Sequence, residues 1–144
     1  MRRWTVTSTS STLGVPVPST NTRRVGLALS VLAILVLLAD GLSQLLAWSP
    51  AIGAAAEIGW PVTPGFWQGI GALLLASTLL YAIARTAVFG AVLITGYLGA
   101  AIGAHARIGQ GAVAPIVAAL VIAAVVWGGL WLRDARVRAL TRAR

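Results

Sequence analysis

Four long runs of apolar residues dominate the pattern along the chain. They cover residues 25–48, 65–84, 86–106 and 112–132, and short segments with polar residues, glycine or proline separate them. A bilayer core about 30 Å thick is crossed by about twenty helical residues, since each residue adds about 1.5 Å. With such short connections, neighbouring spans must run antiparallel. The pattern therefore predicts an all-α fold, an integral membrane four-helix bundle.

The segments outside these runs define the expected domain organisation. Residues 1–22 are rich in Ser and Thr and are predicted to form a disordered tail. Residues 23–133 form the predicted membrane domain, and residues 134–144 form a short basic tail. A cleaved signal peptide is the alternative reading of the first run. Signal peptides have about 7–15 apolar residues in their central region, so the greater length of this run favours an uncleaved helix.

Composition indicates that lipid covers much of the surface. Of the 144 residues, 58% are hydrophobic and only 10% are charged. Soluble domains have about 25% charged residues, and a soluble chain of this length is too small to bury so much apolar surface. The lipid bilayer is therefore the first predicted partner.

The charge is strongly basic, with a formal net charge of +8, and every basic residue except the single histidine is arginine. A basic soluble protein would suggest nucleic acid, but here the arginines stand at the ends of apolar runs, so no nucleic-acid partner is expected. In an antiparallel bundle all of them except Arg107 fall on one side. The positive-inside rule then places both termini of this multi-pass protein in the cytoplasm.

Few polar side chains fall within or beside the outer half of the spans, and these form the candidate site. Asp40 and Gln44 lie four positions apart, on one face of the first span. The predicted outer polar cluster consists of Asp40, Gln44, Glu57, His105 and Arg107. An acid within a span costs about 3 kcal/mol on insertion scales, so it is usually functional or paired. A purely structural pairing of Asp40 with Arg107, or secondarily with His105, is the alternative.

Small residues suggest where helices approach closely. Gly65, Gly69, Ala72 and Ala76 form a stripe in the second span, and Gly96, Gly99 and Gly103 cluster on one face of the third. Membrane helices often pack through such residues, because small side chains let the backbones come together. Both groups are expected at helix contacts.

Several kinds of chemistry are not expected. The chain has no cysteine and one histidine, so iron–sulfur clusters, cysteine-ligated haem and haem held by two histidines of one chain are excluded. The acids are scattered and lack metal-ligand spacing, so no metal site is predicted. Neither a Walker loop nor a dinucleotide-binding fingerprint nor a Ser-His-Asp arrangement stands in a suitable context.

The segment from Arg85 to Gly109 resembles the DoxX-like family of small bacterial membrane proteins. Ile58-Gly59-Trp60-Pro61 and the segment from Trp127 to Arg136 support the resemblance, which covers about residues 25–140. One departure is Gln44, where many members are expected to have lysine. The resemblance implies a four-helix bundle in the bacterial inner (plasma) membrane. It also implies a redox-associated subunit linked to quinone, with a soluble or membrane oxidoreductase as partner. A non-enzymatic scaffold or small-molecule carrier is the alternative function, and the sequence leaves open whether the protein is an enzyme.

Overall fold

The computed structural model describes residues 20–47, 59–61, 63–108 and 113–142, together with Gly53 and Ala56. All regular secondary structure in these residues is helical. Four long helices are followed by a short one: α1 (Thr20–Leu45), α3 (Pro64–Ala82), α4 (Ala87–Ile108), α5 (Val113–Arg133) and α6 (Ala135–Arg142). Each long helix matches one predicted span, and the prediction of an all-α four-helix membrane bundle is confirmed. Glu57 and the predicted tail up to residue 19 lie outside the described residues.

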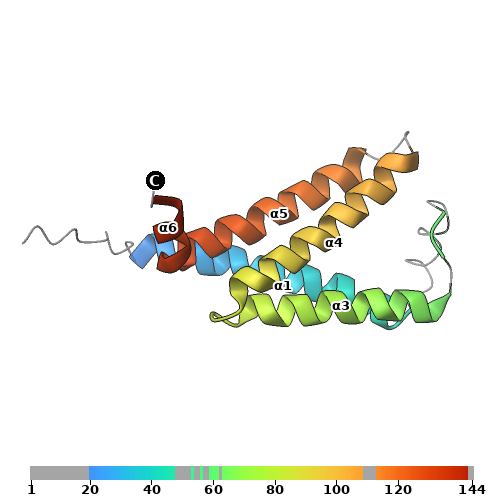
Figure 1. Ribbon diagram of the computed structural model, residues 1–144, viewed down its shortest axis with the longest axis horizontal. Helices are drawn as coiled ribbons and strands as arrows, with labels where there is room; N and C mark the ends of the chain where they lie inside the picture. Colours follow the sequence, from blue (N-terminus) through green and yellow to red (C-terminus); the bar gives the residue numbers. More distant parts are fainter. Residues whose placement is uncertain are drawn as a thin grey trace, which may run out of the picture.

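The long helices form a ring in which α1 and α4 lie across from each other, and each of them packs against α3 and α5. The start of α1, the connection between α3 and α4, and the end of α5 with α6 lie at one end of the bundle (Figure 1). This is called the arginine end, because Arg23, Arg24, Arg85 and Arg133 belong to it. From it, α3 and α4 diverge toward the opposite, far end (Figure 1).

The outer surface of the bundle is apolar along all four long helices. Large exposed side chains include Leu35, Leu79, Val92 and Val117, one on each helix. Each helix is also long and apolar enough to cross a membrane. Such a surface is covered by lipid rather than water, and the protein is a multi-pass membrane protein.

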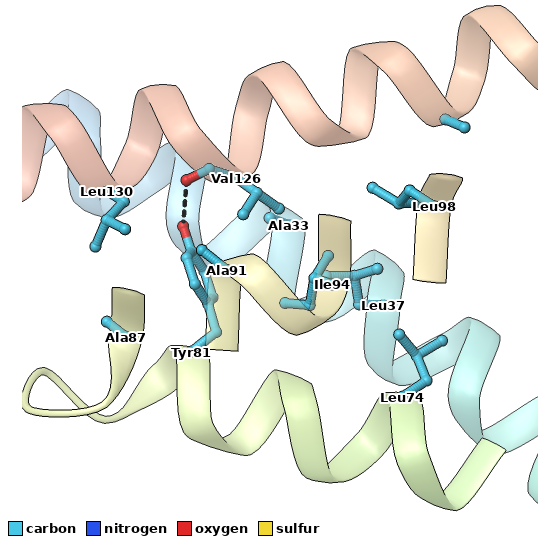
Figure 2. Packing of buried hydrophobic residues seen from close by; sticks show 11 residues of the cluster. Ala33, Leu37, Leu74, Tyr81, Ala87, Ala91, Ile94, Leu98, Val126 and Leu130 are labelled. Atoms are coloured by element: carbon cyan, nitrogen blue, oxygen red, sulfur yellow. Dashed lines mark hydrogen bonds between the residues drawn. The ribbon is translucent and has the colours of Figure 1, made fainter. Parts of the chain in front are cut away.

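A buried tyrosine joins three helices in the half of the bundle nearer the arginine end. The Tyr81 hydroxyl donates a hydrogen bond to the Val126 carbonyl oxygen at 2.8 Å (Figure 2). Its oxygen also lies 3.1 Å from the Ser30 hydroxyl. The Arg133 guanidinium lies over the Tyr81 ring, 4.7 Å from its centroid, and donates to the Tyr81 carbonyl oxygen at 2.7 Å. These contacts connect α3 to α1 and α5. They also give hydrogen-bond partners to polar groups that the surrounding hydrocarbon could not satisfy.

The prediction that the two groups of small residues lie at helix contacts was wrong. Gly65, Gly69, Gly96, Gly99 and Gly103 are exposed, and a side-chain carbon added to any of them would lie more than 4 Å from every other part of the described chain apart from its own helix backbone. Ala72 and Ala76 are exposed too, because the buried face of α3 is instead formed by six other residues. These are Trp67, Gly71, Leu74, Ser77, Thr78 and Tyr81.

Other glycines make the close helix contacts. A carbon added at Gly71 would lie 2.5 Å from the Leu45 backbone nitrogen and 2.7 Å from the Gly41 carbonyl oxygen. One added at Gly129 would lie 2.7 Å from the Ser30 hydroxyl. The α1–α3 and α1–α5 contacts therefore depend on the absence of a side chain at these positions.

The basic C-terminal segment contains a helix that the sequence pattern did not indicate. Asp134 separates α5 from α6, and one of its carboxylate oxygens accepts a hydrogen bond from the Arg136 backbone N–H at 2.9 Å. This is the role of an N-cap residue, which supplies an acceptor to a free N–H at a helix start. Asp134 thus starts a new helix at the point where the membrane span ends.

Candidate functional site

Three polar side chains meet inside the bundle and form what is called here the inner polar group: Asp40, Gln44 and Tyr97. The Tyr97 hydroxyl donates to Asp40 Oδ2 at 2.7 Å. Gln44 Nε2 donates to Asp40 Oδ1 at 3.0 Å and to the Tyr97 oxygen at 2.6 Å. Asp40 and Gln44 belong to α1 and Tyr97 to α4, so the group connects the two helices that lie across the bundle from each other.

The inner polar group borders a large cavity between α3 and α4. Its volume is about 700 Å³, within the range of about 300–1,000 Å³ typical of small-molecule sites. The walls are mainly apolar and include Ile70 and Leu73 of α3 and Leu93 of α4. Leu73 and Val92 line the cavity and are also exposed on the outer surface. The cavity therefore opens sideways, between α3 and α4, toward the region that lipid occupies.

An aromatic cluster closes one side of the cavity at the far end. Trp60, Phe66 and Trp67 have ring centroids 5.5 to 5.8 Å apart. Trp67 Nε1 donates to the Pro61 carbonyl oxygen at 2.6 Å, which ties the segment before α3 to the helix. Trp60 and Trp67 both line the cavity. Tilted aromatic rings of this kind give a rigid, apolar wall with few conformational degrees of freedom.

The structure brings together some of the predicted site residues and separates others. Asp40, Gln44 and His105 line the same cavity. Arg107 instead lines a neighbouring hollow of about 390 Å³, together with Gly59 and Trp60. Glu57 lies outside the described residues. The expected pairing of Asp40 with Arg107 or His105 differs from the structure, since the Asp40 carboxylate is hydrogen-bonded to Gln44 and Tyr97.

Sequence reasoning missed the aromatic part of the site. It left open whether Tyr97 forms a hydrogen bond inside the bundle or faces lipid, and it gave no role to Trp60 or Trp67. One signal was available for Tyr97, because a hydroxyl in mid-span needs a partner and Asp40 was the nearest acid in expected depth. No pattern in the sequence indicated the two tryptophans, whose approach depends on the fold of the segment before α3.

The chemistry available in the cavity is that of hydrogen bonding and apolar contact. Among the described residues, no group of three or more His, Asp or Glu side chains is close enough to hold a metal ion. The polar lining consists of the inner polar group, His105 and the indoles of Trp60 and Trp67. This lining suits a ligand with an apolar body and a small polar head.

Fold and cavity together define a class of protein: a small multi-pass membrane bundle with a cavity open toward lipid. A model of the DoxX-like family matches residues 28–129. The chain therefore belongs to the DoxX-like family. Neither the curated proteins nor the solved structures gave a significant match to this chain.

Proposed function

We propose that this protein binds a lipophilic small molecule of the quinone class and acts as the membrane subunit of a redox system. The observation behind the proposal is the cavity of about 700 Å³, with apolar walls and a polar group at its inner end. A quinone has the matching shape, an apolar tail and a ring with hydrogen-bonding oxygens. The sideways opening toward lipid suits a ligand that is dissolved in the bilayer. The redox link of the DoxX-like resemblance is the second support.

A direct test uses the tryptophans of the cavity wall, because quinones quench indole fluorescence at short range. We expect a short-chain quinone to quench the purified protein saturably in detergent. The double variant Trp60→Phe, Trp67→Phe should lose most of the saturable quenching. Trp131→Phe is the matched control, since Trp131 lies on α5, is 40% exposed and is not part of the cavity lining.

Two results would count against quinone binding in the cavity. One is quenching that rises linearly with quinone concentration and never saturates, as partition into detergent would produce. The other is a Trp131→Phe variant that loses as much saturable quenching as the double variant does. Either result would mean that quinone does not bind in this cavity.

The carrier function is the second candidate, and the sideways opening favours it, because a lipid-accessible cavity also suits transfer of a molecule without chemistry. The two candidates differ in what happens to bound quinone. In membranes containing this protein and its partner, a redox subunit changes the quinone redox state when reductant is added, whereas a carrier does not. Affinity purification in mild detergent, followed by mass spectrometry, identifies the oxidoreductase partner that the first candidate requires.

We infer that the protein lies in the inner membrane of a bacterium with both termini in the cytoplasm. The support is the uneven distribution of arginine. Arg107 lies at the far end of the bundle, while the other described arginines lie at or near the arginine end. These are Arg23, Arg24, Arg85, Arg133, Arg136, Arg138 and Arg142. Cytoplasmic segments carry such an excess of basic residues.

Reporter fusions test this orientation. Alkaline phosphatase, which is active only in the periplasm, should be inactive when fused after Arg144. The same enzyme fused after Gly111, between α4 and α5, should be active. An active fusion at Arg144 together with an inactive one at Gly111 would mean that the topology is inverted.

A further inference from the structure

The donors of the inner polar group are all used within the group, and this limits the kind of ligand that can bind beside it. An amide nitrogen has two N–H donors and a tyrosine hydroxyl has one, while an ionised carboxylate has only acceptors. Both N–H groups of Gln44 are used, one on Asp40 and one on Tyr97. The Tyr97 O–H is used on Asp40. The group therefore has no donor left to offer.

Acceptors remain at the same place. The Asp40 carboxylate accepts these two side-chain hydrogen bonds, although its two oxygens have about four acceptor positions. The Tyr97 oxygen, which accepts from Gln44, has a second lone pair. Gln44 Oε1 has no hydrogen-bond partner among the described residues, but it is fully buried, so a ligand in the cavity does not reach it. The inner end of the cavity is thus rich in acceptors without donors.

The other polar groups of the lining lie on the far-end side of the cavity. His105 follows Tyr97 by eight positions on α4, which is about 12 Å along a helix. Trp60 belongs to the segment before α3, and the indole N–H of Trp67 is already used on Pro61. Donors for a ligand are therefore found near the far end, and only acceptors at the inner end.

We propose that the cavity prefers a ligand whose ring carries a hydroxyl group, so that it binds a hydroquinone or related phenol more tightly than the corresponding quinone. This rests on the proposed function and specifies its ligand. A hydroxyl donates to the Asp40 carboxylate or the Tyr97 oxygen. A quinone carbonyl is only an acceptor, so at the inner end it would face other acceptors and leave buried polar groups unpaired. A neutral hydroxyl fits better than an ammonium group, because Gln44 and Tyr97 already donate to the carboxylate and a hydroxyl brings no second charge into the apolar cavity.

The test compares probes that differ by one hydrogen-bond donor. We expect 4-heptylphenol to bind the full-length protein in detergent at least about tenfold more tightly than 4-heptylanisole, in which a methyl group replaces the hydroxyl hydrogen. Calorimetry measures both affinities. Under anaerobic conditions, a decyl hydroquinone should exceed its quinone by a similar factor.

Variants connect the preference to the inner polar group. Asp40→Asn replaces an acceptor with a group that also donates, and it should reduce the preference to less than about threefold. Tyr97→Phe is the second variant, in case the first does not fold. Ser43→Ala is the control and should keep the preference, because Ser43 lies beside Gln44 in sequence and its side chain donates to the Asp40 backbone carbonyl, outside the cavity lining.

The outcomes separate this inference from the proposed function. Saturable quinone quenching together with equal or tighter binding of the anisole would overturn the hydroxyl preference and leave quinone binding intact. Absence of binding by every probe, quinone included, would remove the proposed function itself. Tighter binding of 4-heptylbenzylamine than of the phenol would show that the cavity prefers a cation to a neutral hydroxyl, and it would overturn the inference. A preference that persists unchanged in both Asp40→Asn and Tyr97→Phe would also overturn the inference.

Discussion

Gly71→Val is expected to destabilise the bundle by about 1–3 kcal/mol or more, whereas Gly99→Val should leave its stability nearly unchanged. At Gly71 the first carbon of the new side chain would lie 2.5 Å from the Leu45 backbone nitrogen and 2.7 Å from the Gly41 carbonyl oxygen. Backbone atoms of a packed helix cannot move aside as a flexible side chain can. The α1–α3 contact would therefore have to separate.

Gly99 provides a matched control for this change. It lies within a membrane helix like Gly71, and the first carbon of a side chain added there would have no atom of another described helix within 4 Å. The two valine variants share the same helix propensity cost, so their difference isolates packing. Thermal unfolding in detergent is the measurement. An equal loss of thermal stability in Gly71→Val and Gly99→Val would contradict the prediction. It would show that the face of α4 with Gly99 is packed against another surface, such as a second copy of the chain.

The second expected result is a strong coupling between Asp40 and Tyr97. In a double-mutant cycle of Asp40→Asn and Tyr97→Phe, we expect a coupling energy of about 1.5–3 kcal/mol, the range for hydrogen bonds to charged groups. The hydroxyl donates to the carboxylate at 2.7 Å in an environment with few other polar groups. Each single variant removes or weakens the bond between these two part-buried side chains, so the double variant should lose less than the sum.

A parallel cycle with Arg107→Gln is the control for that coupling. Asp40 and Arg107 line different hollows, so their coupling energy should be close to zero. Unfolding in detergent measures both cycles on the same scale. A large coupling energy for Asp40–Arg107, with none for Asp40–Tyr97, would contradict this prediction. It would favour the ion pair that the sequence suggested over the hydrogen bonds of the inner polar group.

Part of the candidate site was accessible from the sequence. Asp40 and Gln44 stand out because a charge or amide inside an apolar run is rare, and their spacing puts them on one helix face. His105 stands out as the single histidine, at the end of a span. The partner of Asp40 was not accessible in the same way. Depth along the spans suggested Arg107, but the side chain that reaches the carboxylate is Tyr97, and this depends on how α4 is rotated.

The sequence by itself determined the four spans, their antiparallel order and the concentration of arginine at one end. These features depend only on length, hydropathy and charge along the chain. Only the tertiary structure decided which face of each helix packs inward. In a membrane protein the lipid-facing and the buried side chains are both apolar, so their pattern does not distinguish the two faces. For this reason the glycine stripes were assigned to the wrong face, and the cavity between α3 and α4 appeared only once the helices were placed together.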